Sequence, residues 1–265
     1  MQRHICVIDP QTDFCDPKGA LSVPGAHDDM VRLAKMIKKV SRGINDIYVT
    51  LDSHHEIHVA HPVYWVNAKG EHPAPFTKIS AEDVRNGTWR TTLPSLQSRG
   101  LHYVQTLEKN KRYDLTIWPP HCLIGTLGQT VYEPIRDALS YWCKDRFATV
   151  NWITKGSNPH TEHYSAVVAE VIDDDDFSTQ LNSRFLDSVI TADEVLLAGE
   201  ASSHCVANTV RDAVNYFKDP GLLKKLILLE DCSSPVPTPE SIDQAKKFYA
   251  DMKAMGVRIA RSTDF

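Results

Sequence analysis

Short apolar runs with the length of β-strands alternate with longer amphipathic stretches along most of this chain. Strand-like runs occupy residues 4–9, 45–52, 114–120, 148–155, 193–200, 223–231 and 256–260. Apolar side chains at helical spacing occupy residues 28–41, 204–217 and 239–254. Strands joined through helix-length crossovers run parallel, and a parallel sheet needs helices on both faces. The pattern therefore predicts an α/β fold, a three-layer α/β/α sandwich with a mainly parallel central sheet.

The length and composition of the chain suit one hydrophobic core. The chain has 265 residues, of which 42% are hydrophobic, so we expect residues 1–265 to form a single domain. A stretch at about residues 66–112 is rich in Gly, Pro, Thr and charged residues, with a helical pattern near 93–109. It has too few apolar residues for a core of its own. We expect this stretch to be an insertion, lid or interface element rather than a second domain.

Charge and hydropathy argue against nucleic-acid and membrane partners. The formal net charge of −5 comes from interspersed acidic and basic residues. We interpret the acidic run Asp173–Asp176 as solvated surface, because four adjacent side chains cannot all face one ion. No stretch approaches the roughly 18–20 apolar residues of a membrane span. The six cysteines lack paired spacing, which favours free thiols in the cytoplasm. The sequence leaves open whether the chain forms a homo-oligomer.

Polar residues stand at the carboxyl ends of two strand-like runs, where ligands bind in parallel sheets. Asp9 follows the apolar run Ile5–Ile8, and partial desolvation there would raise its pKa and suit a general base. A loop-capping carboxylate is the alternative, and it is our interpretation of Asp13. Lys155 ends the run 148–155, and its ammonium group would favour a neighbouring thiolate, although many lysines at strand ends only extend into solvent.

A histidine-rich loop directly after the second strand-like run predicts a metal site. Imidazole and carboxylate groups from two strand ends suit zinc, iron or manganese. Where the protein supplies only some of the ligands of such an ion, the remaining coordination positions are open to water or substrate. The candidate ligands are Asp52, His54 and His121. Clustered histidines are more often surface or hydrogen-bonding residues, so we expect His55 and His61 to lie outside the ligand set. The pattern leaves His58 undecided.

The segment GEASSHC, residues 199–205, places a cysteine where a strand meets a helix. Unpaired N–H groups and the dipole at a helix N-terminus stabilise a thiolate, and Lys155 nearby would add to this effect. The same N–H groups can hold the oxyanion that forms when a thiolate adds to a carbonyl group. Cys205 is therefore the candidate nucleophile, whereas we interpret Cys15 and Cys122 as structural.

Five motifs in one order carry a family resemblance over nearly the whole chain. They are IDPQTDFCDPKGALSVPGA, TLDSHHEIH, WPPHC, WITKG and GEASSHCVANTVRDA. Together they resemble the isochorismatase-like cysteine hydrolases, specifically the nicotinamidase branch, because the D-x-H and WPPHC pair is similar to the metal-bearing members. The resemblance implies that Asp9, Lys155 and Cys205 form a catalytic triad. It also implies a cis peptide bond between Glu200 and Ala201, so that the Ala201 and Cys205 amides form an oxyanion hole.

The same resemblance implies a substrate site and a reaction. In that branch one divalent metal ion binds the pyridine nitrogen; zinc is our first choice, with iron and manganese as alternatives. Phe14 and Trp118 occupy the positions of the aromatic residues that sandwich the ring. The expected protein is a metal-containing cysteine amidohydrolase, a nicotinamidase that converts nicotinamide to nicotinic acid and ammonia through a Cys205 thioester. Such a reaction belongs to pyridine nucleotide biosynthesis.

Three alternatives stay open. A related amidase of the same family would act on another small amide or carbamoyl compound. The stretch at about 66–112 favours this alternative, because it lies between the metal-ligand motifs and could reshape the pocket. Metal-activated hydrolysis would leave Cys205 a bystander. A catalytically silent metal-binding interaction protein would keep the fold without the activity.

Overall fold

Parallel strands form the central sheet of the protein. The structure, a computed structural model, describes residues 1–265, with the side chain of Ser188 outside the description. The described residues form a six-stranded sheet in the order β10-β9-β8-β1-β2-β7, and each neighbouring pair is parallel. The strands are β1 (Arg3–Ile8), β2 (Asp46–Asp52), β7 (Asn151–Lys155), β8 (Glu194–Gly199), β9 (Leu226–Leu229) and β10 (Arg258–Ala260). The almost continuous burial of β1, β8 and β9 is typical of strands covered on both faces.

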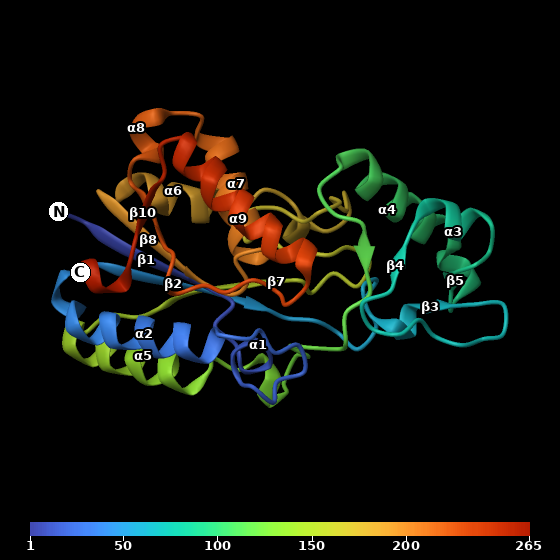
Figure 1. The fold of residues 1–265 in the computed structure, drawn as a ribbon, viewed down its shortest axis with the longest axis horizontal. Coiled ribbons are helices and arrows are strands. Elements are labelled where there is room, and N and C mark those ends of the chain that lie inside the picture. The colour runs from blue at the N-terminus through green and yellow to red at the C-terminus, as the bar shows by residue number, and fades with distance from the viewer.

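Helices cover both faces of this sheet (Figure 1). One face carries α2 (Ala26–Lys39) and α5 (Glu133–Arg146), and the other carries α6 (Ser183–Thr191), α7 (Cys205–Phe217) and α9 (Pro239–Ala254). Two short helices, α1 (Thr12–Cys15) and α8 (Pro220–Leu223), lie in the connections. The predicted three-layer sandwich is confirmed. Within the described chain, no helix is both long enough and apolar enough to span a membrane.

The inserted segment, residues 66–112, lies to one side of the sheet (Figure 1). It contains α3 (Ala81–Arg85), α4 (Gln97–Asn110) and most of two short antiparallel ladders, which pair β3 (Trp65–Val66) with β5 (Arg90–Thr91) and β4 (Lys78–Ile79) with β6 (Leu115–Thr116). The helix predicted near 93–109 is confirmed, although its first turn, Pro94–Leu96, is a 3-10 helix. The single-domain organisation of the chain stays a prediction.

The strand predicted at residues 114–120 is wrong for most of its length. Only β6 forms there, and it pairs antiparallel with β4 outside the central sheet. Two consecutive prolines, Pro119 and Pro120, have no N–H group to donate to a neighbouring strand. The N–H of Trp118 instead donates to Ala60 O at 2.7 Å, so the run serves as a link that ties the inserted segment to the histidine-rich loop.

Candidate active site and metal centre

The order of the sheet brings four strand ends together. β8, β1, β2 and β7 are neighbours in the sheet, and Asp52 and Lys155 are paired residues at the carboxyl ends of β2 and β7. Asp9 directly follows β1, and Cys205 begins α7, the helix that comes after β8. Parallel strands end at the same edge, so residues far apart in sequence meet here.

Lys155 contacts the other two groups of the predicted triad and one predicted metal ligand. Its Nζ lies 2.8 Å from Asp9 Oδ2, 3.1 Å from Asp52 Oδ1 and 3.6 Å from Cys205 Sγ. Asp9 is fully buried, and its Oδ1 accepts a hydrogen bond of 2.5 Å from the Thr50 hydroxyl group. The structure thus gathers Asp9, Asp52 and Cys205 around one buried ammonium group.

Burial and charge set the protonation of these groups. Burial raises the pKa of Asp9, and Lys155 opposes this shift only in part. Burial alone would lower the pKa of Lys155, but the Asp52 and Asp9 carboxylates outweigh it and hold that pKa well above its usual range. Burial also raises the pKa of Cys205 well above its usual value, although Lys155 opposes it. Burial thus works against the thiolate that Lys155 and the helix N-terminus would stabilise.

Two backbone N–H groups beside the thiol are free to bind an anion. The Glu200–Ala201 peptide bond is cis, as expected. His204 N–H donates to Ala201 O at 3.0 Å, whereas among the described residues neither the Ala201 nor the Cys205 N–H donates a hydrogen bond. Unpaired N–H groups at a helix N-terminus favour negative charge. The predicted oxyanion-hole residues therefore have the donors that such a site needs.

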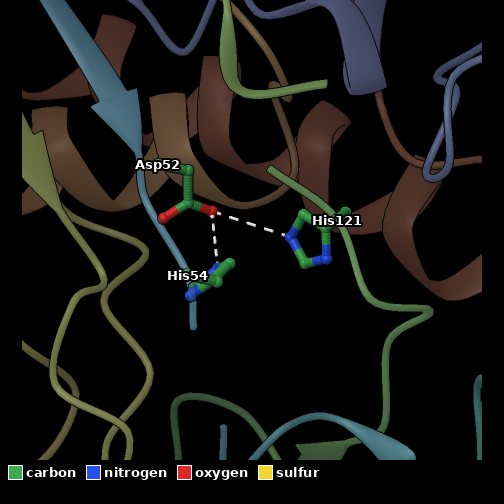
Figure 2. A group of neighbouring side chains, drawn as sticks. All are labelled: Asp52, His54 and His121. Carbon is green, nitrogen blue, oxygen red and sulfur yellow. Dashed lines mark hydrogen bonds and ion pairs between the residues drawn. The ribbon is translucent and has the colours of Figure 1, made fainter. Parts of the chain in front are cut away.

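The three predicted metal ligands converge, as Figure 2 shows, and one of them, Asp52, lies next to Lys155. Asp52 Oδ2 lies 3.0 Å from His54 Nε2 and 3.7 Å from His121 Nε2. All three side chains are buried, and each places one ligand atom within 4.8 Å of the other two. Asp52 therefore faces Lys155 with one carboxylate oxygen and the two imidazoles with the other.

Backbone carbonyl groups fix which ring nitrogens face Asp52. His54 Nδ1 donates to Gly156 O at 3.0 Å, and His121 Nδ1 donates to Pro119 O at 2.8 Å, because a carbonyl oxygen only accepts. Each Nε2 then turns a lone pair toward a carboxylate oxygen, which a proton or a metal ion must compensate. Burial alone would lower the pKa of His54, but the Asp52 carboxylate outweighs it and raises the pKa to about 9. This donor set fits a divalent metal ion.

The other histidines of this loop have different environments. His55 is exposed, and His61 is buried near the cluster but belongs to neither group of potential ligands. His58 is buried and uses both ring nitrogens: its Nδ1 accepts from Ala60 N–H, and its Nε2 donates to Thr161 O, each at 3.2 Å. These hydrogen bonds hold His58 in place beside the cluster.

Glu162 is a buried carboxylate at the cluster that the sequence pattern did not reveal. Its Oε1 lies 3.9 Å from His54 Nε2, and its Oε2 has no hydrogen-bond partner among the described residues. His54, His58 and Glu162 form a second group whose ligand atoms lie within 4.8 Å of one another. A single glutamate in an irregular segment has no spacing signal, and only its closeness in sequence to Lys155 could have suggested it.

A small cavity of about 30 Å³ lies beside Cys205. Phe14 and Trp118, the predicted aromatic residues, line it together with Tyr164 and His204, which sequence analysis did not single out. Trp118 Nε1 donates to Tyr164 OH at 3.0 Å, and the Trp118 ring meets His204 edge-on with 5.4 Å between the ring centroids. An outer groove of about 450 Å³ between the inserted segment and α9 shares Trp118 and His204 as lining residues.

Asp13 and the acidic run, which sequence analysis placed outside the catalytic site, and the cysteines have the following environments. Asp13 caps its loop by accepting hydrogen bonds from the N–H groups of Ala20 and Cys122, at 3.1 and 2.7 Å. The acidic run Asp173–Asp176 is not entirely solvated, because Asn158 donates to its first and last carboxylates at 2.9 Å each. All six cysteines are free thiols.

Known proteins of similar sequence and structure include nicotinamidases and pyrazinamidases. No protein-family model matches the chain. The nicotinamidase of Saccharomyces cerevisiae is 24% identical over 258 residues, which cover 97% of this chain and 98% of the yeast protein. The structure of the yeast nicotinamidase bound to the inhibitor nicotinaldehyde has a TM-score of 0.66 at 22% identity, covering 98% of this chain and 100% of that chain.

Two further solved structures have the same fold. A nicotinamidase/pyrazinamidase from Acinetobacter baumanii has a TM-score of 0.66 at 22% identity, covering 99% of this chain and 97% of that chain. The pyrazinamidase of Pyrococcus horikoshii in complex with zinc has a TM-score of 0.58 at 21% identity, covering 98% of this chain and 99% of that chain. These likenesses confirm the α/β fold.

Proposed function

The chain is a distant, full-length relative of the nicotinamidase/pyrazinamidase family, and from this premise we propose that it is a metal-containing cysteine amidohydrolase that converts nicotinamide to nicotinic acid and ammonia. The observation that carries the proposal is the set of contacts made by Lys155, which hold Asp9 and Cys205 in one buried site. The family likeness supports the choice of nicotinamide, and the six free cysteines support a place in the cytoplasm.

The first half of the reaction forms a thioester. As the Cys205 sulfur attacks the amide carbonyl carbon, its proton passes to the Asp9 carboxylate, whose raised pKa suits this transfer. The C–S bond forms, and the Ala201 and Cys205 N–H groups donate to the carbonyl oxygen as it becomes an oxyanion. Asp9 then gives the proton to the amide nitrogen, the C–N bond breaks, and ammonia leaves. Lys155 stays protonated and offsets the charge of Asp9 throughout.

The second half of the reaction hydrolyses the thioester and regenerates the free Cys205 thiol. Asp9, again a carboxylate, takes a proton from water while the water oxygen adds to the thioester carbon. The same two N–H groups hold the second oxyanion. The C–S bond then breaks, the acid leaves, and Asp9 returns its proton to the Cys205 sulfur. Each proton taken by Asp9 is thus given back within the cycle.

Asp52, His54 and His121 would hold the divalent metal ion, with Glu162 next to them. When bound, such an ion supplies a Lewis acid that orients the substrate, whereas Cys205 supplies the nucleophile. The deeply buried carboxylate and the two carbonyl-anchored imidazoles support this proposal. Zinc is the first choice, because the pyrazinamidase of Pyrococcus horikoshii binds it.

A second candidate is a related amidase that acts on another small amide or carbamoyl compound. The outer groove favours it, because a groove of about 450 Å³ adjoins the small inner cavity and is lined in part by the inserted segment. A substrate with a substituent beyond its ring could extend through this opening. Phe14 and Trp118 would contact the ring in either case.

The direct test is release of ammonia from nicotinamide by the purified, metal-replete protein. We expect turnover by the wild-type protein and its loss in Cys205→Ala, because the thioester cannot form without the thiol. Cys143→Ala is the matched control, since Cys143 lies on α5, on the other face of the sheet, and should keep full activity. Turnover that persists in Cys205→Ala would refute the cysteine mechanism. Turnover of other amides, with none of nicotinamide, would favour the second candidate.

A further inference from the structure

The chain that leaves the inserted segment packs against the residues that precede the nucleophile. Directly after this segment, the Tyr113 hydroxyl group donates to Ser203 O at 2.8 Å. The Tyr113 ring stacks on His204, with 5.0 Å between the ring centroids and 25° between the ring planes. One side chain thus contacts both residues that stand immediately before Cys205.

Neighbouring contacts fix Tyr113 in this position. Arg112 Nη2 pairs with Asp212 Oδ1 at 2.8 Å, and Arg112 Nε donates to Asn208 Oδ1 at 3.2 Å. Both partners belong to α7, the helix that begins with Cys205. The last part of the inserted segment is therefore tied by charge-assisted hydrogen bonds to the helix that carries the nucleophile.

Ser203 and His204 determine the geometry on both sides of the thiol. The Ser203–His204 peptide group lies between Ala201 and Cys205, whose N–H groups face the reacting carbonyl in the proposed mechanism, and it leads into the first turn of α7. The His204 ring forms part of the wall between the inner cavity and the outer groove. A change at Ser203 O would move the N–H groups, and a change at the His204 ring would alter the shape of the cavity.

We infer that Tyr113 is a positioning residue, which acts on catalysis through Ser203 and on substrate binding through His204. The inference rests on the proposed function for its reaction. It also assigns a role to the inserted segment, whose last residues place Tyr113 beside the residues that precede the nucleophile. The hydroxyl group and the ring have separable effects, because the hydroxyl group holds the Ser203 carbonyl, with Asn208 Oδ1 as a longer partner at 3.3 Å, and the ring holds the His204 side chain.

Two substitutions separate these effects. Tyr113→Phe keeps the stacked ring and removes only the hydroxyl group, so kcat should fall about 3- to 10-fold, the effect of one neutral hydrogen bond, with KM unchanged. Tyr113→Leu also removes the ring, so KM should rise by a further 2- to 10-fold, the usual effect of one aromatic pair. Thermal unfolding of each variant verifies that it is folded.

A readout that needs no known substrate distinguishes failure of this inference from failure of the proposed function. The rate of Cys205 alkylation by iodoacetamide, measured at Cys205 by peptide mass spectrometry, should fall at least about 3-fold in Tyr113→Phe. Tyr216→Phe is the matched control, since Tyr216 lies on the same helix and is partly exposed, and its rates should match the wild type.

Each result has a defined meaning. A Tyr113→Phe variant with wild-type kcat and wild-type alkylation rate would overturn the inference, as would equal losses in Tyr216→Phe. A wild-type protein that does not hydrolyse nicotinamide would refute the proposed substrate alone. The alkylation rates would in that case still decide the role of Tyr113.

Discussion

Replacement of Lys155 by methionine should strongly destabilise the protein. Lys155 Nζ lies 2.8 Å from Asp9 and 3.1 Å from Asp52, and at an effective dielectric constant of about 20 each contact corresponds to roughly 5–6 kcal/mol of attraction. Burial of the ammonium group costs several kcal/mol and offsets much of this attraction. Lys155→Met leaves two buried carboxylates without their common cation, so we expect the free energy of unfolding to fall by about 3–5 kcal/mol.

Urea unfolding of metal-free protein measures this loss, and its pH dependence tests the cause. Without Lys155, the folded-state pKa of Asp9 rises further above its unfolded value, because burial already raises it. Folding then takes up a proton, so the loss in Lys155→Met should be largest near pH 8 and should shrink toward pH 5. Lys246→Met, at an exposed lysine paired with Asp243, should cost less than about 1 kcal/mol. An unchanged unfolding free energy in Lys155→Met, or a loss that grows toward low pH, would refute the reasoning.

The remaining predictions concern the metal cluster and a buried acid. His54→Ala should weaken binding of the divalent ion more than about 100-fold, measured as metal content after dialysis. His55→Ala, at the exposed neighbouring residue, should bind the ion as the wild type does. Equal metal content in both variants would exclude this ligand set. Burial and the nearby Asp29 raise the pKa of Glu200 well above its usual value. Folding therefore takes up a proton, and the wild type should lose stability relative to Glu200→Gln as the pH rises from 5 to 8; parallel stability curves in urea would contradict this.

Periodicity predicted the regular elements that pack against the sheet. The predicted helices at 28–41, 204–217 and 239–254 correspond to α2, α7 and α9 within about two residues at each end. These helices have clear apolar stripes or a proline at the start, and both signals are local. By contrast, residues 114–120 are apolar enough for a central strand, but the part of them that forms a strand, β6, pairs with β4 of the inserted segment instead. The hydropathy of a short segment does not show which other part of the fold will bury that segment.

Residues of the candidate site were predictable from the sequence where a charged residue stands at the carboxyl end of a strand. Asp9, Asp52 and Lys155 stand at such ends, and the parallel order of the sheet brings them together. Glu162 and Tyr113 carry no such signal, because each depends on the path of an irregular connection through space. The protonation of Cys205 was also beyond the sequence, since it depends on how completely neighbouring segments exclude water.

The position of Lys155 in the sheet affects how the protein tolerates heat. Lys155 ends β7, which lies at the edge of the described sheet and is hydrogen-bonded to β2 alone. Parts of a fold can open locally while the rest stays intact, and such openings require less free energy than global unfolding. When β7 separates from β2, the ammonium group leaves Asp9 and Cys205 while the core persists. We therefore expect activity to be lost at a lower temperature than the one at which the whole molecule unfolds, and activity and unfolding curves measured over the same temperatures would show this.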